Sequence, residues 1–321
     1  MVLLVTNTKD ATADYLCSSL QANGMGHLRF DTDQYLSRYK VSYKSSNDSE
    51  SFVLRDEISR NELCSREVTG VWYRRPVAPE LSIDEEPPEI SSQLSIEARV
   101  QYESVIATVP TRNWISAPDR IFVSENRLLQ LRVARECGLS IPSTIIANSS
   151  QEMMQFIETH DRCCTKPLFS GQFNTREGLK LFYTTIVDKN DTKFVAAVRN
   201  FPVLVQEYVD KQYELRLIVV GRSIFPVKIY SQDDTRTATD WRVENCTIPR
   251  YEATEVPNEL LAAARRIVSR FGLQFSSMDI IVTQNGGYYF LDLNPNGQWA
   301  WLDSMLHLGV SSTLANMLVG E

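Results

Sequence analysis

The sequence predicts an α/β protein of 321 residues whose later part folds into α+β lobes. Two patterns support this fold class. Near the N-terminus, the buried-type apolar run Val2–Thr6 is followed by a helical stretch over 11–21, as in an α/β unit. Beyond Gly138, β-prone runs alternate with helical ones, which is typical of an α+β module. We expect three domains, at residues 1–118, 119–205 and 206–321.

The first expected domain continues with short strands and one long helix. Gly24 and Gly26 end the first helix. Leu94, Ala98 and Ile106 recur at helical spacing and predict the long helix. The expected elements are strands at 27–30, 70–73 and 114–115 and a helix at 92–108.

Proline and glycine mark the elements that follow. Pro118 opens a helix, and Gly138 with Pro142 ends it, while Ser149 suits the N-cap of the next helix. The expected helices are 118–137, 149–159 and 257–271. The expected strands are 144–147, 162–167, 179–187, 203–209, 214–220, 223–230, 275–283 and 288–293.

Composition excludes several classes of protein. The net charge of −7 argues against general nucleic-acid binding, and no apolar run is long enough for a signal peptide or a membrane-spanning helix. Six cysteines without a C-x-x-C pair predict reduced thiols in a cytoplasmic protein. Three histidines argue against a histidine-rich zinc site and a Ser-His-Asp hydrolase. The oligomeric state is not readable, and a homodimer is one option.

The most informative stretch is an acidic hairpin between positions 275 and 294. Asn285-Gly286 between two apolar runs is a strong hairpin signal, because both turn residues need positive φ. A two-residue turn there places Asp279 directly opposite Asp292, with Asn294 diagonal to Asp279 on the same face. A turn at Gly286-Gly287 would shift the register and remove this pairing.

Two carboxylates that face each other across a ladder repel, and a bound cation would relieve that repulsion. Asp279, Asp292 and Asn294 offer three hard oxygen ligands on a rigid hairpin, which suits Mg²⁺. We expect Met278, Ile280, Leu291 and Leu293 to occupy the opposite, apolar face. The alternative is that both aspartates simply point into solvent.

This acidic pattern near the end of the chain resembles the metal site of the ATP-grasp ligases, which bind ATP and Mg²⁺. The resemblance implies an ATP-grasp fold with an N-terminal α/β pre-grasp domain. It places Arg127 where the family has a phosphate-binding Lys, and Asp292 where Glu is usual. Lys166 matches the second phosphate-binding lysine of the family, and residues 170–178 resemble its mobile phosphate cover.

The resemblance also assigns the remaining nucleotide contacts. Glu207, Tyr208 and Val209 resemble the hinge that meets adenine, and Glu214 resembles the ribose-binding acid. Arg216 lies two residues further along the same strand and would stabilise the transferring phosphoryl group. Lys166 and Arg216 are thus the expected catalytic residues. Taken alone, Glu214 and Arg216 could form an ordinary ion pair.

Two segments are similar to the microviridin-type, or graspetide, branch of the family. They are Trp72-Tyr73-Arg74-Arg75-Pro76 and Asn294-Pro295-Asn296-Gly297-Gln298-Trp299. The resemblance implies an ADP-forming carboxylate ligase that phosphorylates Asp or Glu side chains of a ribosomal precursor peptide. Attack by another side chain then closes an ester or amide cross-link. The expected partner is a precursor with a leader and an acidic core, for which Arg74, Arg75 and Arg242 are the candidate contacts.

Three functions stay open from the sequence. The first is macrocyclisation of a precursor peptide. The second is a RimK-like amino-acid or tail-glutamate ligase. The third is a degenerate peptide- or nucleotide-binding module, which the departures at Arg127 and Asp292 motivate. Alternative readings also remain for Arg74 and Arg75, which could be a solvated pair, and for Trp299 and Trp301, which are expected in the core or in pocket walls.

Overall fold

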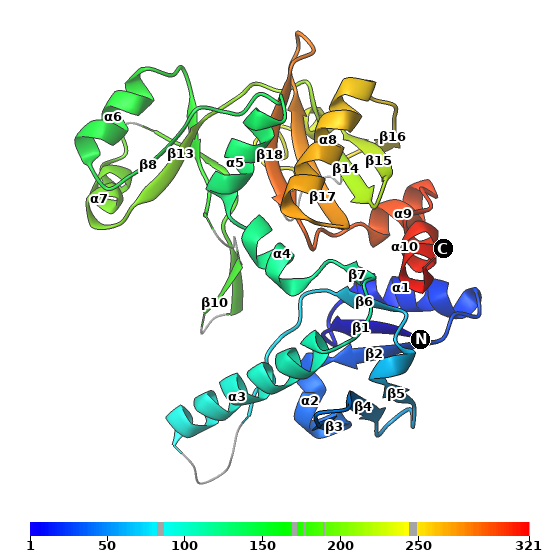
Figure 1. The fold of residues 1–321 in the computed structure, drawn as a ribbon. Helices are drawn as coiled ribbons and strands as arrows, with labels where there is room; N and C mark the ends of the chain where they lie inside the picture. The colour runs from blue at the N-terminus through cyan, green and yellow to red at the C-terminus, as the bar shows by residue number, and fades with distance from the viewer. Residues whose placement is uncertain (82–86, 169–171, 176–177, 189, 244–248, 321) are drawn as a thin grey trace.

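The structure is a computed structural model that describes residues 1–81, 87–168, 172–175, 178–188, 190–243 and 249–320. Side chains at 88, 172–175, 178, 179 and 192 are outside this description. Figure 1 shows an N-terminal unit in blue and cyan, a green lobe, and a yellow-to-orange lobe that is followed by two red helices. No helix in the described ranges is long and apolar enough to cross a membrane.

The N-terminal unit is built on a parallel sheet with the strand order β2-β1-β6-β7. The inner strand β1 is completely buried, as expected for an apolar strand with neighbours on both edges. The side chain of Asp10 caps the following helix by accepting from the N–H groups of Thr12 and Ala13. These elements are β1 (Val2–Thr6), α1 (Ala11–Ala22), β2 (His27–Asp31), β6 (Gly70–Tyr73) and β7 (Trp114–Ile115).

Residues 32–67 contain elements that were not predicted. They form a small antiparallel sheet, β3 (Tyr39–Ser45), β4 (Glu50–Asp56) and β5 (Glu62–Cys64), together with α2 (Tyr35–Arg38) and the 3₁₀ turns η1 (Thr32–Gln34) and η2 (Ser65–Glu67). Much of β3 is exposed, so its polar composition hid the strand. The long helix α3 (Pro88–Ala107) starts earlier than expected and extends away from the unit (Figure 1).

The helix predicted at 118–137 is wrong as a single element. The chain forms α4 (Pro118–Ser124) and α5 (Arg127–Glu136), with a break at Glu125 and Asn126. Asn126 has extended backbone angles, and its side chain accepts a 3.0 Å hydrogen bond from the Leu129 N–H. A residue that caps a new helix cannot continue the old one. The break therefore sets Arg127 at the first turn of α5.

The green lobe is a four-stranded sheet in the order β12-β9-β13-β8, covered by two helices. Its elements are β8 (Thr144–Ala147), α6 (Ser150–Glu158), β9 (Cys163–Thr165), β12 (Thr185–Ile186), α7 (Thr192–Asn200) and β13 (Val203–Glu207). The single strand predicted at 179–187 is wrong: β11 (Gly178–Leu181) pairs with β10 (Gln172–Thr175) in a separate hairpin, and β12 belongs to the main sheet.

That hairpin occupies most of the stretch expected as a mobile phosphate cover at 170–178. Residues 170, 171, 176 and 177 of this stretch lie outside the described residues. The described parts are strands β10 and β11 rather than irregular loop.

The second lobe has a five-stranded sheet in the order β16-β15-β14-β17-β18. Helix α8 carries an apolar stripe that packs on it, and the helix ends at Gly272, whose φ is +66°. The elements are β14 (Tyr213–Val220), β15 (Ser223–Ile229), η3 (Ser231–Asp233), β16 (Tyr251–Ala253), α8 (Asn258–Phe271), β17 (Phe275–Val282), β18 (Tyr288–Asn294), α9 (Ala300–Leu306) and α10 (Val310–Val319).

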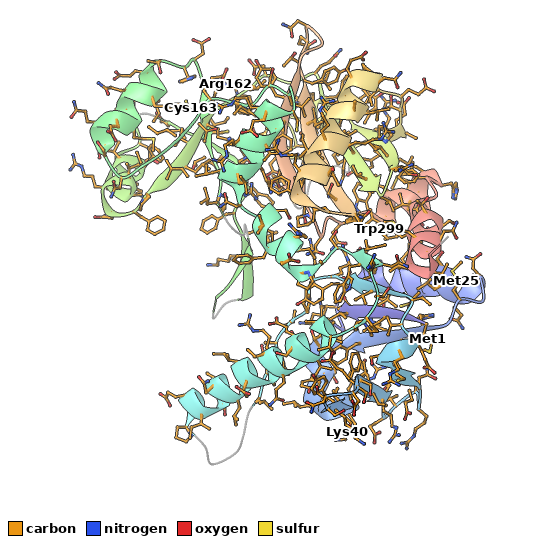
Figure 2. The ribbon with its side chains drawn as sticks, in the orientation of Figure 1. Met1, Met25, Lys40, Arg162, Cys163 and Trp299 are labelled. Atoms are coloured by element: carbon orange, nitrogen blue, oxygen red, sulfur yellow. The ribbon has the colours of Figure 1, made fainter. Side chains whose placement is uncertain are left out.

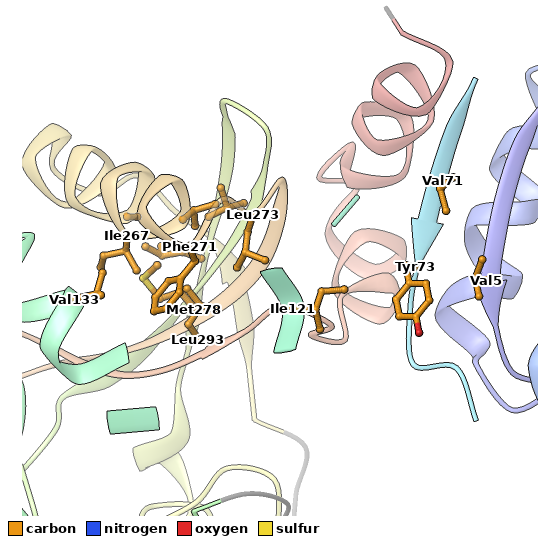
Figure 3. Close-up of a cluster of buried hydrophobic side chains, with 14 of the residues drawn as sticks. Val5, Val71, Tyr73, Ile121, Val133, Ile267, Phe271, Leu273, Met278 and Leu293 are labelled. Atoms are coloured by element: carbon orange, nitrogen blue, oxygen red, sulfur yellow. The ribbon is translucent and has the colours of Figure 1, made fainter. Parts of the chain in front are cut away.

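The hydrophobic cores join the N-terminal unit to this second lobe. Trp72 of β6, Phe275 of β17 and the fully buried Trp299 belong to one cluster. A second cluster includes Val5 and Val71 of the unit together with Met278 of the lobe, with Ile121 between them (Figure 3). A Cβ on Gly70 would lie 2.2 Å from the carbonyl oxygen of Leu318, so α10 packs directly on β6. The unit and the lobe therefore share an interior.

Candidate active site

A pocket lies where the two lobes meet, and it gathers most of the predicted site. Its lining includes nine predicted residues: Arg127, Lys166, Glu207, Tyr208, Val209, Glu214, Arg242, Asp279 and Asp292. Four predicted residues are not in the lining: Arg74, Arg75, Arg216 and Asn294. The lining also contains residues that the sequence analysis missed, of which Lys211 and Asp240 are basic and acidic.

Asp279 and Asp292 are paired across the β17–β18 ladder as expected, but not by the expected turn. The hairpin closes with Thr283 and Gly287, whose N–H and carbonyl are 3.0 Å apart. The loop between them has three residues, and Gly286 has a φ of +81°. This shifts the register by one residue, and a bulge at Leu291 shifts it back before Asp292.

The bulge also corrects the expectation for the apolar face. Met278, Ile280 and Leu293 are buried in the core as predicted. Leu291 instead lines the pocket, next to Asp292. Two adjacent residues of β18 can face the same side because the bulge interrupts the alternation of the strand.

The expected metal ligands form a crowded acidic pair. The Asp279 and Asp292 side chains are each about a quarter exposed, at 24% and 23%. Burial raises the pKa of Asp279, Arg216 lowers it, and Asp292 raises it again. Arg216 lies 3.2 Å from Asp279, and Arg127 lies 3.6 Å from Asp292. Two partly open carboxylates that repel one another fit a hard divalent cation.

Asn294 is tied into the backbone beside this pair. It lies at the end of β18 opposite Ser277, and its Oδ1 accepts a 2.9 Å hydrogen bond from the Asn296 N–H. In the described part of the chain, no three His, Cys, Asp or Glu side chains form a metal-binding group. A cation here would therefore rely on the two aspartates and on an amide oxygen.

Helix α5 positions strand β18 and the guanidinium group of Arg127. The buried Gln130 side chain donates to the carbonyl of Leu293 at 2.8 Å and accepts from its N–H at 3.0 Å. These two bonds pair α5 with the free edge of β18. Arg127, one turn earlier on α5, is thereby held against Asp292.

Lys166 enters the pocket from the strand β9 side. Its Nζ lies 3.4 Å from the carbonyl oxygen of Leu291, the bulge residue. Burial lowers the pKa of Lys166 to about 8; Asp292 opposes this shift, and Arg127 adds to it. Lys166 and Arg127 thus form a dense positive patch next to the acidic pair, which is suited to phosphate oxygens.

The expected hinge lies at the end of β13. The backbone N–H of Glu207 donates to the carbonyl oxygen of Ser143, and the N–H of Tyr208 donates to the carbonyl oxygen of Arg162, both at 2.9 Å. The Arg162 guanidinium also stacks over the Tyr208 ring, 4.2 Å from its centre. Figure 2 labels Arg162 and Cys163 in the green lobe, where strand β9 begins. The crossing between the lobes is therefore held by backbone bonds as well as by a stacked cation.

Glu214 has a buried partner that the sequence analysis missed. Lys211 donates to Glu214 Oε1 at 2.6 Å and to the carbonyl of Thr239 at 3.1 Å. Both side chains are about 95% buried. Burial raises the pKa of Glu214, and Lys211 pulls it down. The signal in the sequence was the spacing of three residues from Lys211 to Glu214, which brings the two charges together at the start of β14.

Arg216 lies on strand β14, which pairs with strand β17 beside the acidic pair. Register places it directly across from Asp279, and only 6% of the residue is exposed. Its Nε has no partner among the described residues. Glu214 and Arg216 face the same side of β14, as predicted, but they are not each other's partners: Glu214 bonds to Lys211 and Arg216 to Asp279.

Arg242 is held by an aspartate that was also missed. The buried Asp240 accepts from Arg242 at 2.8 and 2.6 Å and from the Thr184 N–H at 3.1 Å. Burial alone would raise the pKa of Asp240, but these bonds bring it down to about 2. Asp240 thus connects the β14–β18 lobe to the segment between β11 and β12, and it orients Arg242 at the pocket.

The expectation that Arg74 contacts substrate is corrected by its burial. Arg74 is 0% exposed and pairs with Asp10 at 2.8 Å, and its other donors bind this chain. No peptide can reach it. Arg75 is exposed and donates to the carbonyl of Asn296 at 3.1 Å, so it stays a candidate. Trp299 is in the core, and Trp301 packs on Trp241 at the pocket wall.

Comparisons with known families divide the chain into two matched parts. Residues 1–121 match the MvdD pre-ATP grasp domain. Residues 124–318 match the RimK-like ATP-grasp domain. No curated protein sequence matches the chain.

Several solved structures match the whole chain. The macrocyclase MdnC from Microcystis aeruginosa MRC, bound with the precursor peptide MdnA, is 26% identical with a TM-score of 0.86. The macrocyclase MdnB from the same source is 26% identical with a TM-score of 0.79. Each match covers 100% of this chain and 99% of the other.

A RiPP-associated ATP-grasp ligase from Chryseobacterium gregarium, in complex with ADP and a leader and core peptide, shares the fold. It is 22% identical with a TM-score of 0.88, over 99% of this chain and 96% of that one. The fold class predicted from the sequence is confirmed by the two family matches. The chain belongs to the RimK-like ATP-grasp family and carries an MvdD-type pre-ATP grasp domain at its N-terminal side.

Proposed function

We propose that this protein is an ATP- and Mg²⁺-dependent macrocyclase of a ribosomally made precursor peptide. The carrying observation is the pocket, which brings the expected nucleotide residues next to the opposed carboxylates of Asp279 and Asp292. The match to MdnC, which was crystallised with its precursor peptide, covers the chain from end to end and supports this branch.

The two ends of the pocket suit the two ends of ATP. Glu207, Tyr208 and Val209 line the hinge side, where adenine would lie, and the buried Glu214 would accept from the ribose hydroxyls. Lys166 and Arg127 would hold the phosphates. Mg²⁺, when bound, neutralises phosphate charge, and Asp279, Asp292 and Asn294 would hold it.

The reaction activates a carboxylate that is otherwise a poor electrophile. The terminal phosphoryl group of ATP moves to an Asp or Glu side chain of the peptide, and ADP leaves. A hydroxyl or amine of the same peptide then attacks, so that an ester or amide forms and phosphate departs. Arg216 stabilises the negative charge on the transferring group, because its planar donors are fixed beside Asp279.

Arg75 and Arg242 are the proposed contacts for the acidic core of the peptide. Both are exposed, and Arg242 lines the pocket itself. Asp240 keeps the Arg242 guanidinium oriented in the absence of peptide. Peptide binding therefore costs less side-chain conformational entropy at Arg242. Arg242 at the pocket would offset the overall charge of −7 locally.

The test takes from the reading frames beside the gene a short peptide with a Thr- and Asp/Glu-rich core, if one is encoded there, and incubates it with ATP and Mg²⁺. Mass spectrometry should show the loss of one water for each ring that closes. A RimK-like amino-acid ligase is the second candidate, because residues 124–318 match that domain. It would add the mass of whole residues to a chain instead. A peptide that keeps its mass while ATP binds would favour a binding module.

A further inference from the structure

The loop at residues 294–298 begins with the proposed metal ligand Asn294 and is held mainly by side chains of the N-terminal unit. We call it the NPNGQ loop. It connects β18 to α9 and lies where that unit meets the β14–β18 lobe, next to Trp299, which Figure 2 labels.

Arg74 provides most of the polar contacts to this loop. Its guanidinium donates to the carbonyls of Asn296 at 3.0 Å and Gly297 at 3.2 Å, and to Gln298 Oε1 at 3.0 Å. Asp10 fixes the guanidinium from behind, 2.8 Å from its Nε. Asp10 also caps α1, so the whole arrangement is anchored in the N-terminal unit.

The other side of the loop touches the site directly. The N–H of Asn296 donates to Asn294 Oδ1 at 2.9 Å. A Cβ on Gly297 would lie 2.4 Å from Cβ and Oγ of Ser277 and 3.2 Å from the Arg216 guanidinium. The loop backbone therefore packs against the strand that carries Asp279 and against Arg216, with no space to spare.

We propose that Arg74 is a positioning residue for the metal and phosphoryl-transfer site, acting through the carbonyls of the NPNGQ loop. This inference rests on the proposed function. The N-terminal unit thereby supplies a structural part of the catalytic centre: Arg74 fixes the loop, and the loop fixes Asn294 and Arg216. Groups that orient metal ligands from behind commonly matter to affinity almost as much as the ligands themselves.

The alternative is that Arg74 only stabilises the contact between the N-terminal unit and the β14–β18 lobe. The packing of the two parts argues against this alternative. The contact between the N-terminal unit and the lobe is already large and apolar, with Trp72, Phe275 and Leu314 in one buried cluster. A buried ion pair adds little net stability over apolar packing, because both charges lose their hydration. Its geometry, in contrast, fixes three acceptors of one short loop at once.

The test measures metal binding rather than turnover. In Arg74→Met, the affinity for Mn²⁺ in the presence of ADP is read from the electron paramagnetic resonance signal of free Mn²⁺. We expect a loss of about 10- to 100-fold, the usual effect of removing such a supporting group. ADP affinity without metal should stay within about twofold of the unsubstituted protein, because Arg74 does not line the pocket.

Arg38→Met is the matched control. Arg38 also belongs to the N-terminal unit and pairs with Asp56 at 2.7 Å and Asp31 at 3.3 Å, but its hydrogen bonds stay within that unit. Equal Mn²⁺ affinity in Arg74→Met and Arg38→Met would overturn the proposal. An unsubstituted chain that binds neither ADP nor Mn²⁺ would refute the proposed function, and this inference with it.

A second pair of variants decides the question if Arg74→Met does not fold. Gly297→Ala leaves Arg74 in place but pushes the loop away from Ser277, and it should weaken Mn²⁺ binding in the same way. Adding Ser277→Gly removes the two atoms that the new Cβ would meet most closely and leaves only the 3.2 Å approach to the Arg216 guanidinium, so it should restore most of the affinity. Unchanged Mn²⁺ affinity in Gly297→Ala would contradict the positioning role of the loop.

Discussion

Asp279 and Asp292 face each other across the β17–β18 ladder because the bulge at Leu291 restores a register that the turn had shifted. The bulge has a second effect, since the carbonyl of Leu291 lies 3.4 Å from Lys166 Nζ. One local irregularity thus brings together the acidic pair and a cation for phosphate. Bulges often aim side chains at functional sites in this way.

Removing either carboxylate of the pair should abolish turnover. We expect Asp279→Asn and Asp292→Asn to lower the rate of ADP release by at least about 100-fold, because each amide lacks the charge that a divalent cation requires. Asp119→Asn is a suitable control, since Asp119 is exposed and distant in sequence from the hairpin. ADP release near the unsubstituted rate in both hairpin variants would remove the metal assignment.

The Lys211–Glu214 pair makes a prediction about stability. Lys211→Met leaves the Glu214 carboxylate buried without its partner and should lower the free energy of unfolding by about 3 kcal/mol. The double variant Lys211→Met/Glu214→Gln removes the stranded charge, so it should recover at least half of that loss. Urea denaturation followed by circular dichroism gives both values. A double variant no more stable than Lys211→Met would contradict the pairing.

Lys166 predicts how nucleotide binding responds to pH. Burial lowers its pKa to about 8, so the ammonium is present below pH 8 and is lost above it. Only the charged form attracts phosphate; ADP affinity should therefore fall between pH 8 and 9.5, by up to about tenfold per unit. Lys166→Arg stays charged and should flatten this profile. Parallel profiles for the two proteins, measured by titration calorimetry, would show that another group titrates.

Asp240 predicts a separation between peptide and nucleotide binding. Asp240→Asn frees Arg242 and weakens the bond to the Thr184 N–H, so the KM for the precursor peptide should rise about tenfold. ADP affinity should fall less than peptide affinity, because Arg242 is the proposed peptide contact whereas Lys166 and Arg127 would hold the phosphates. Asp234 offers a matched control, because it also pairs with the arginine two residues on, Arg236, but does not line the pocket. Equal peptide KM values in Asp240→Asn and Asp234→Asn would contradict this orienting role.

The sequence predicted the fold where the pattern of apolar residues was strong. Two elements are where they were expected: the buried strand β1 (Val2–Thr6) and the amphipathic helix α8 (Asn258–Phe271). The exposed strand β3 was missed because its outer residues face water and carry no apolar alternation. The break at Asn126 was missed because an N-cap inside a helical pattern gives only a local signal.

The candidate site was predicted where residues are close in sequence or on neighbouring strands. Asp279 and Asp292 came from one hairpin, although the turn and the bulge were not foreseen. Asp240 was missed although Arg242 is only two residues away, because that spacing does not show that Asp240 is buried and that it also accepts from the distant Thr184 N–H. Arg74 was placed in the wrong role, because an Arg-Arg pair carries no sign of which member the fold buries.

The most direct test of the macrocyclase assignment compares the amount of ADP formed with the number of water molecules lost from the peptide. A candidate precursor peptide with a Thr- and Asp/Glu-rich core is incubated with the enzyme, ATP and Mg²⁺, and ADP and peptide mass are followed together. The assignment predicts one ADP for each water lost, with both absent in Asp292→Asn. ADP formation without loss of water from the peptide would contradict the macrocyclase assignment, and ring closure that persists in Asp292→Asn would contradict the role of Asp292 as a metal ligand.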